Sequence, residues 1–292
     1  MMLELAHVTK HYRTGTFGGS DLLAVSDVSF RIARGEIVSL IGESGSGKST
    51  IGRMILRLTP ISGGTITFEG TDVTTLGQAR LKDYYRLVQG VFQDPFSAYN
   101  PIFKADRIFS MIREGFYPGM SAATFGAKLE EALAAVCVNP AEVLHKYPHQ
   151  LSGGQLQRLL IARALLLDIR LLVADEVISM LDASTRIDVL NCLADLKERG
   201  LGILFITHDL SLGNYVSDQT VILRHGRVVE MGETEKVFGD PRHPYTRMLL
   251  AAVPQLHTKW AELPPELPAA EEDERGELEL VESGHFVLRT GS

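Results

Sequence analysis

The segment Gly42–Ser49 has the residue types and spacing that bind phosphate. It reads GESGSGKS, which fits G-x-x-x-x-G-K-[ST] between a strand pattern and a helical pattern. Glycines let the backbone curl so that successive N–H groups and a helix N-terminus face an anion. A glycine-rich turn can match by chance, but this context favours nucleotide binding. We expect Lys48 to reach the β- and γ-phosphates and Ser49 to bind Mg²⁺. The residues expected at the nucleotide are Gly42, Ser44, Gly45, Ser46, Gly47, Lys48, Ser49 and Thr50.

Two acidic residues, Asp175 and Glu176, follow the apolar run Leu171–Ala174. Sheets of α/β proteins place ligand groups at the carboxyl ends of their strands. One carboxylate there suits Mg²⁺, and its neighbour projects differently and can polarise an attacking water. By itself such a pair is more often a helix cap or a surface feature. The phosphate loop that precedes it makes the chemical interpretation preferable.

A third motif, LSGGQ at Leu151–Gln155, lies about 100 residues after the phosphate loop and about 20 before the acidic pair. Ser152 and Gln155 have the S-x-x-Q spacing of a capping box, which predicts a helix that runs to about Leu167. Many nucleotide enzymes carry a phosphate loop, whereas this pentapeptide restricts the chain to one ATPase superfamily.

With these motifs in this order, residues 3–254 resemble the nucleotide-binding subunit of an ATP-binding cassette (ABC) transporter. The resemblance implies ATP and Mg²⁺ as cofactors. It implies an α/β fold with a RecA-like P-loop NTPase core, an antiparallel β subdomain and an inserted α-helical subdomain at about 97–165. On this interpretation residues 1–242 form the ABC ATPase domain, and residues 243–292 form a C-terminal extension.

The resemblance also assigns roles to single residues. Glu176 matches the catalytic glutamate, His208 the switch histidine at the γ-phosphate, and Gln93 the glutamine that senses Mg²⁺ and the attacking water. Lys48 completes the catalytic set. Taken alone, His208 would be a structural histidine and Gln93 an ordinary polar loop residue. The expected Mg²⁺ contacts are Ser49, Gln93 and Asp175.

Further roles concern the adenine and a partner subunit. Tyr12 matches the aromatic that stacks on adenine, although it could simply pack an edge strand, and Phe17 is a competitor. The motif Ser179–Asp182 matches a dimer-contact loop. In the family, the signature residues bind the γ-phosphate of the nucleotide held by the partner subunit; here they are Ser152, Gly153, Gly154 and Gln155. His145 and His149 show no ligand spacing, so we expect them at the surface or in turns.

Three positions depart from the family pattern. Val177 stands where proline is common, Leu156 where a basic or polar residue is frequent, and Gln150 where glutamate is common. None of these departures removes a catalytic group. The properties on which they bear are the turnover rate of ATP hydrolysis and the partner that faces the helix after the signature motif.

The segment His243–Pro254 is similar to a C-terminal element of the oligopeptide, dipeptide and nickel branch of importer ATPases. On structural grounds alone it is a turn and a helix start. Val281–Leu288 resembles the last strand of that branch, and Glu271–Glu274 is expected to be a solvated loop. Some members carry an iron–sulfur centre in this tail. No cysteine follows Cys192, so we expect no such centre here.

The family mechanism implies specific partners. We expect a head-to-tail dimer with a second ABC ATPase (a different chain, with a homodimer as the alternative), two transmembrane permeases and, indirectly, an extracytoplasmic solute-binding protein. Phe96, Tyr99 and Pro101 are candidates for the permease contact, with packing as the alternative role. The expected place is the cytoplasmic face of the cell membrane. Peptides are the leading cargo; nickel, oligosaccharides and a soluble non-transport ATPase are the alternatives.

Hydrophobic periodicity predicts the elements that position these residues. Helix Gly47–Leu58 is expected to bury one face, and a hairpin over Val221–Glu230 is expected to turn at His225 and Gly226. Thr14–Ser20 reads as a flexible turn. The expected strands are Leu3–Tyr12, Val25–Ile32, Glu36–Ile41, Thr65–Glu69, Leu171–Ala174 and Ile203–Thr207. The other expected helices are Ala105–Glu114, Ser121–Val138 and Ala183–Arg199.

Composition excludes several classes of protein. The net charge of −7 comes from residues 261–292, where nine acidic residues face two arginines, so residues 1–260 sum to zero. This charge pattern lacks the basic footprint of a nucleic-acid binder. With only Cys137 and Cys192, a disulfide scaffold is not expected. No run reaches the ~18 apolar residues of a membrane span, and the N-terminus lacks a signal-peptide pattern.

Overall fold

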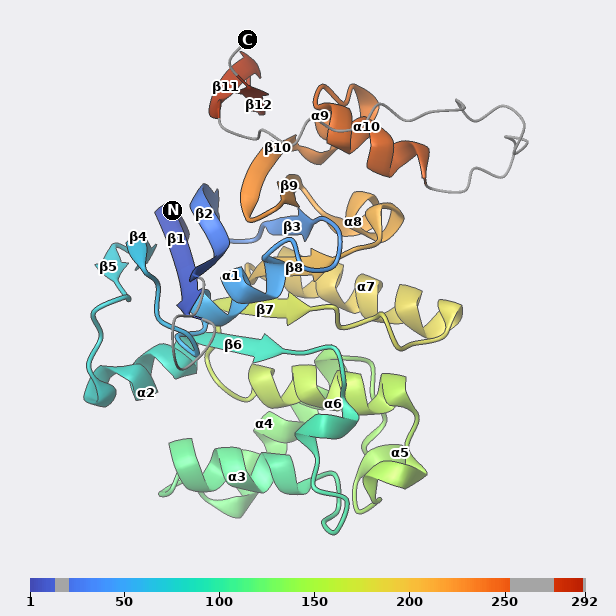
Figure 1. Ribbon diagram of the computed structural model, residues 1–292. Helices are drawn as coiled ribbons and strands as arrows, with labels where there is room; N and C mark the ends of the chain where they lie inside the picture. The colour runs from blue at the N-terminus through green and yellow to red at the C-terminus, as the bar shows by residue number, and fades with distance from the viewer. Residues whose placement is uncertain (14–20, 253–275, 291–292) are drawn as a thin grey trace. The chain divides into compact units, whose positions relative to one another are not determined.

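The computed structural model describes residues 1–13, 21–252 and 276–290 of the 292-residue chain (Figure 1). The chain divides into two compact units. The first unit consists of Met1–Leu76 and Leu204–Ser292, and the second of Gly77–Ile203. The expected turn at 14–20, Phe17 within it, and the expected loop at 271–274 lie outside the described residues.

The first unit contains a four-stranded antiparallel sheet in the order β2-β1-β4-β5. Its strands are β1 Leu3–Arg13, β2 Asp21–Ile32, β4 Gly63–Phe68 and β5 Thr71–Asp72. Exposed positions alternate with buried Leu3 and Leu5 at the start of β1, as expected when only one face of a sheet is covered. The register then shifts near His7, whose φ is 52°. The bulge brings the His7 carbonyl so close to Gly64 that a Cβ there would lie 2.2 Å from it.

The second sheet of the first unit has the strand order β11-β12-β10-β9-β3-β8. Its strands are β3 Ile37–Ile41, β8 Gly202–Thr207, β9 Gln219–Arg224, β10 Arg227–Glu233, β11 Gly276–Glu282 and β12 His285–Thr290. Every residue of β3 and β8 is buried, which is typical of strands covered on both faces. β3 pairs in parallel with β9, whereas β9, β10, β12 and β11 pair antiparallel.

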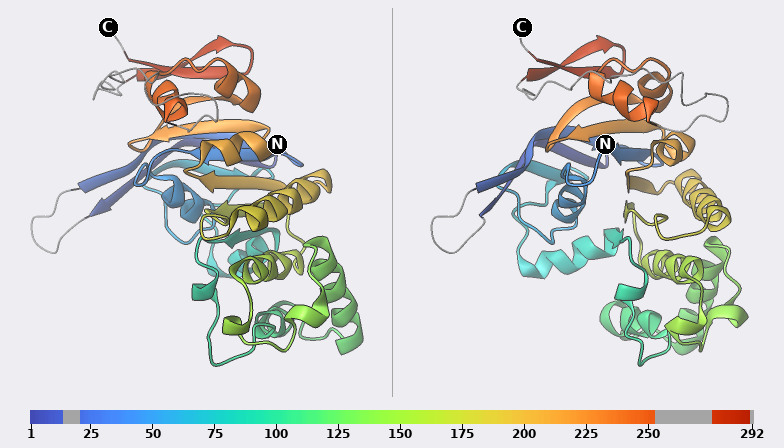
Figure 2. Two further views of the ribbon diagram at one scale, coloured as in Figure 1. Left: turned by 90° about the vertical axis from the view of Figure 1, so that its right-hand side faces the viewer. Right: turned by 45° about the vertical axis from the view of Figure 1, so that its right-hand side comes forward.

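Four helices of the first unit are described: α1 Lys48–Ile55, α8 Leu210–Val216, α9 Thr234–Gly239 and α10 Pro244–Ala251. Figure 2 shows α9 and α10 in orange beside β10 and the red hairpin of β11 and β12. One apolar cluster joins these elements to the parallel strands; its members are Ile41, Leu210, Ile222, Val229, Val237, Tyr245 and Leu288. The C-terminal elements therefore share a core with the strand that leads into the phosphate loop.

The second unit is largely helical around two parallel strands, β6 Val88–Val91 and β7 Leu171–Asp175. Its helices are α2 Gln78–Leu87, α3 Arg107–Phe116, α4 Ala122–Ala135, α5 Pro140–Val143, α6 Gly153–Leu165 and α7 Ala183–Glu198. Helix α6 contacts α3, α4, α7 and β6, so the helix that begins at the signature motif is the centre of this unit.

Two predicted elements are wrong in extent. The helix expected to reach Leu58 ends at Ile55, because Arg57 has φ 57° and the backbone turns there; Leu58 is 58% exposed and does not join the buried face. The strand expected at Val281–Leu288 is instead a hairpin. It turns at Ser283 and Gly284, where the glycine supplies φ 74°. The remaining predicted strands, helices and the turn at His225 and Gly226 are confirmed to within a few residues at each end.

Within the described ranges, none of the helices combines the length and hydropathy that crossing a membrane requires.

The two cysteines, both free thiols in the second unit, differ in exposure. Cys192 lies on α7 and is 3% exposed, with its thiol 3.8 Å from the Ala135 carbonyl. Burial raises the pKa of the Cys192 thiol to about 12. Because the thiolate is the reactive form, Cys192 is protected chemically as well as sterically.

We therefore predict that a maleimide at neutral pH modifies the native protein at Cys137 and leaves Cys192 unmodified. Peptide mass spectrometry after brief labelling measures both sites. Labelling in denaturant is the control, since unfolding gives the two thiols similar reactivity. Equal labelling of the native protein would contradict the burial of Cys192.

Candidate functional site

The phosphate loop follows β3 directly and closes on its own lysine. Lys48 begins α1, and its ammonium donates hydrogen bonds to the carbonyls of Gly42 at 2.7 Å and Glu43 at 2.8 Å. Lys48 is only 5% exposed. A buried charge needs such partners, because removing an ammonium from water costs several kcal/mol unless it is paired. The sequence thus places the lysine charge inside the curve of the loop.

Two glycines of the loop are required by neighbouring backbone. A Cβ at Gly42 would lie 2.1 Å from the Leu223 carbonyl, and one at Gly47 would lie 2.5 Å from the Ala24 carbonyl. Gly47 also has φ 103°, a backbone conformation that residues with a side chain rarely adopt. The amide of Gly226 donates to the Ser46 carbonyl at 3.0 Å. The loop is therefore held between the end of β9 and the start of β2, with no space for a side chain at Gly42 or Gly47.

The loop fits an anionic ligand. The N-cap of α1 is Gly47, which has no side chain to occupy the backbone N–H groups that a helix start leaves without intrahelical partners. Such groups and the helix dipole bind phosphate. Ser46 is 2% exposed, and its hydroxyl has no partner among the described residues. These donors suit a polyphosphate, whose oxygens in turn supply some of the ligands of a bound Mg²⁺.

His208 and Tyr12 are the other predicted site residues of the first unit. His208 is exposed and follows β8. Its neighbour Asp209 fixes the turn: its amide donates to the Thr207 hydroxyl, and its carboxylate caps α8. Tyr12 lies on β1, partly buried, with the Lys10 ammonium 4.9 Å from its ring centre. The aromatic face of Tyr12 is thus already close to a cation of its own strand.

In the second unit, β7 ends at the acidic pair. Asp175 is the last residue of the strand and is 7% exposed, while Glu176 is half-buried with φ 50°. A left-handed conformation at a residue other than glycine stores strain and is concentrated at functional sites. The turn that holds it is closed by Ser179, whose amide and hydroxyl both donate to the Glu176 carbonyl. The chain therefore turns directly after Asp175, at the residue that carries the second carboxylate.

The signature motif forms the predicted capping box at the start of α6. The Ser152 hydroxyl accepts from the Gln155 amide at 3.2 Å, and the Gln155 side-chain oxygen accepts from the Ser152 amide at 3.0 Å. The two glycines between them differ in the space that surrounds them. A Cβ at Gly154 would lie 2.1 Å from the Thr185 methyl on α7, whereas the nearest atom at Gly153 belongs to Leu181 at 3.5 Å.

Gln93 lies exposed after β6, and α6 holds the strand that leads to it. Gln157 donates to the Phe92 carbonyl at 3.3 Å, and Arg163 donates to the Gly90 carbonyl at 3.2 Å. Burial lowers the pKa of the Arg163 guanidinium. Sequence reasoning missed both positioning residues. The available signal was the presence of polar side chains within the otherwise apolar stretch that follows the signature motif.

The remaining predicted surface residues fall into two groups. Met180 in the dimer-contact motif is 60% exposed and Phe96 is 49% exposed, so both are available for contacts. Tyr99 is not: it is 7% exposed and donates to the Leu156 carbonyl at 3.0 Å, which favours the packing role. Asp182 caps α7, and the Thr185 amide, with the Ser184 and Thr185 hydroxyls, lowers its pKa to about 2.

The three departures from the family pattern have structural explanations. Val177 and Leu156 are 1% and 0% exposed, so apolar side chains suit these positions. Gln150 accepts a hydrogen bond from the Tyr147 amide at 2.9 Å and closes the turn before the signature motif.

Comparison with known proteins decides the family. Residues 25–179 match the model of the ABC transporter family, which is more than half of the chain. The chain belongs to the ABC transporter family. It is thus an ABC-type ATPase subunit with ATP and Mg²⁺ as its cofactors. Residues 229–276 also match the C-terminal region of oligopeptide/dipeptide transporters.

Individual relatives agree with this membership. The chain is 42% identical over 260 residues to a putative peptide import ATP-binding protein of Brucella ovis, covering 87% of this chain and 78% of the relative. It is 37% identical over 302 residues to the oligopeptide transport ATP-binding protein OppF of Bacillus subtilis, covering 99% and 96%. A dimeric ATP-binding cassette solved in a post-hydrolysis state with ADP and phosphate is similar with a TM-score of 0.71, at 28% identity over 80% of this chain and 99% of that one.

We predict that Gly42→Ala lowers both the stability of the ABC subunit and its ATP affinity, because the added methyl meets backbone that cannot rotate away. Overpacking of this kind costs about 1–3 kcal/mol. Thermal unfolding and nucleotide titration measure the two effects. The matched control is Gly126→Ala within α4, where a Cβ meets nothing within 4 Å. Equal behaviour of the two variants would refute the steric argument.

Proposed function

We propose that this ABC subunit hydrolyses ATP to power an importer of di- or oligopeptides. The observation that carries the cargo class is the C-terminal region at 229–276, which matches oligopeptide/dipeptide transporters and builds α9, α10 and the end of β10 into the core of the first unit. The relatives named above, which carry peptide or oligopeptide import in their names, support the same class.

We assign the chemistry to the residues that the sequence singles out. Lys48 and the amides of the phosphate loop bind the β- and γ-phosphates, and Tyr12 stacks on the adenine. Ser49, Asp175 and Gln93 hold Mg²⁺, which neutralises phosphate charge when bound. Glu176 accepts the proton of the attacking water as general base. His208 contacts the γ-phosphate. The half-buried position and left-handed backbone of Glu176 support its role, since strain of this kind accompanies function.

The proposed assembly is a head-to-tail pair of ABC subunits bound to two permeases. In it, the signature residues Ser152, Gly153, Gly154 and Gln155 contact the nucleotide held by the other subunit. ATP favours the closed pair and hydrolysis favours the open one, a two-state equilibrium biased by ligand. A solute-binding protein on the other side of the membrane delivers the cargo. Phe96 and Pro101, both exposed and shortly after Gln93 in the sequence, supply the permease contact, and the chain works from the cytoplasmic face.

We predict that Glu176→Gln retains ATP binding and lowers turnover by about 10²–10⁴-fold, the usual contribution of a general base. The amide keeps the size of the side chain but cannot take a proton. Phosphate release and nucleotide titration measure the two quantities. Glu198→Gln, an exposed change at the end of α7, is the matched control and should hydrolyse at the native rate. Unchanged turnover in Glu176→Gln would reject the assigned base.

We predict that the tagged chain, extracted from native membranes in mild detergent, co-purifies with two permeases and a second ATP-binding subunit. Mass spectrometry identifies the companions, and the ligand eluted from the associated solute-binding protein identifies the cargo. A peptide supports the proposal. Nickel or an oligosaccharide changes the cargo but keeps the transporter. Recovery of a chain without membrane companions would reject the transporter function.

A further inference from the structure

Tyr245, in the C-terminal region, reaches the phosphate loop. It lies on α10 and is fully buried, and its hydroxyl accepts a hydrogen bond from the Glu43 amide at 3.1 Å. About 200 residues separate the two positions in the chain, and both belong to the first unit. The contact is thus a direct link between the C-terminal region and the nucleotide-binding loop.

The link acts on the peptide group that also holds Lys48. The carbonyl of Gly42 and the amide of Glu43 belong to one peptide bond, and these two groups point in opposite directions in a trans peptide. The Lys48 ammonium binds the carbonyl at 2.7 Å, and the Tyr245 hydroxyl binds the amide. The peptide is therefore held from both sides. Loss of either partner frees it to rotate and changes where the Lys48 ammonium is anchored.

Tyr245 is itself fixed by polar contacts around it. Its amide donates to Nδ1 of His243, the N-cap of α10, at 3.1 Å. Burial lowers the pKa of His243, which favours the neutral ring that accepts this hydrogen bond. The Arg224 guanidinium lies 4.9 Å from the Tyr245 ring centre, within the range of a cation–π contact. The hydroxyl therefore has little freedom to leave the loop.

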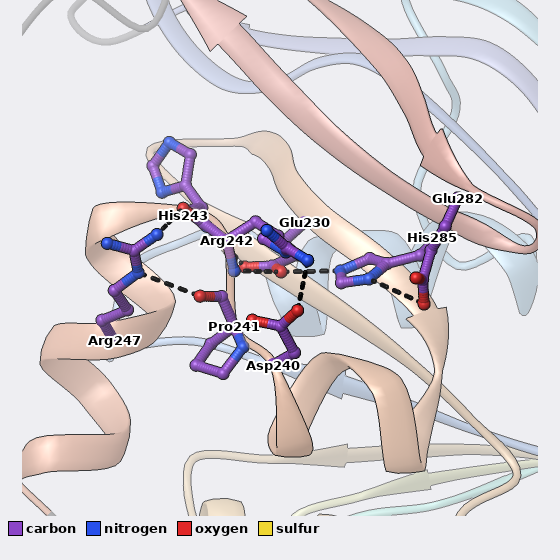
Figure 3. Close-up of polar contacts among 8 residues, drawn as sticks. All are labelled: Glu230, Asp240, Pro241, Arg242, His243, Arg247, Glu282 and His285. Carbon is purple, nitrogen blue, oxygen red and sulfur yellow. Dashed lines mark hydrogen bonds and ion pairs between the residues drawn. The ribbon is translucent and has the colours of Figure 1, made fainter.

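The backbone of His243, the N-cap of α10, is held by a buried acidic residue of β10. Glu230, fully buried, accepts from the amides of Arg242 at 2.8 Å and His243 at 3.0 Å. Figure 3 shows that the imidazole of His285 approaches the same carboxyl group from the hairpin of β11 and β12, at 2.7 Å from its oxygen. Continuous hydrogen bonds thus run from the C-terminal hairpin through Glu230 to the start of α10.

We propose that Tyr245 is a positioning residue for nucleotide binding: its hydroxyl orients the Gly42–Glu43 peptide, and so the C-terminal region sets the shape of the phosphate loop. This inference rests on the proposed ATP binding at the loop. It gives the C-terminal region a direct effect on nucleotide affinity, in addition to whatever it contributes to cargo or assembly.

The test is Tyr245→Phe in the full-length chain, which removes one oxygen and keeps the buried ring. We expect the dissociation constant for ATP to rise about three- to tenfold, the effect of one lost hydrogen bond. We also expect hydrogen exchange at the Glu43 amide to accelerate, while the unfolding temperature stays near that of the native chain. If Tyr245 only packed α10 against the core, its substitution would not change hydrogen exchange at one particular amide of the phosphate loop.

Tyr117→Phe is the matched control. The Tyr117 hydroxyl also forms a hydrogen bond with the backbone, as donor to the Leu166 carbonyl at 2.9 Å, but it lies in the second unit. This variant should keep native ATP affinity and native exchange at Glu43. Equal ATP affinity in Tyr245→Phe and the native chain would overturn the positioning role. Absence of ATP binding by the native chain itself would instead reject the proposed function, so the two failures are distinguishable.

Discussion

The phosphate loop has no room for side chains at two of its glycines, and much of the first unit follows from that constraint. The Leu223 carbonyl at the end of β9 and the Ala24 carbonyl at the start of β2 occupy the space that a Cβ would need. A loop this tightly enclosed can hold a buried lysine, because its own carbonyls are forced close enough to bind the ammonium. The strands around the loop therefore determine its chemistry as much as its sequence does.

Most elements, and the turns that carry the candidate site residues, were predictable because their signals are local. A capping box needs two residues three apart, and Ser152 and Gln155 form it as expected. Apolar runs predicted the buried strands β3, β7 and β8. The end of α1 was missed because Leu58 continues the apolar spacing while the backbone has already turned at Arg57.

Contacts between distant segments could not be predicted in the same way. Gln157 and Arg163 support the strand before Gln93 through backbone carbonyls, and carbonyls leave no sequence pattern. Similarly, His243 and Tyr245 were recognised as a family element, but nothing local connects them with Glu43. Glu230 was assigned only to a hairpin strand, yet it is fully buried and binds two amides. Three-dimensional pairing alone identifies these roles.

The adjacent glycines of the signature motif are subject to different constraints. The Thr185 side chain that fills the space beside Gly154 is held in place by its hydrogen bond to Asp182 at 2.9 Å, so it cannot move aside for a methyl group. Gly153 meets only ordinary contacts. For protein engineering, the packing of α6 on α7 therefore disfavours any substitution at Gly154, whereas a small side chain fits at Gly153. In the proposed head-to-tail assembly, Gly153 is therefore the position at which the contact with the nucleotide of the other subunit can be varied without disturbing the packing of α6 on α7.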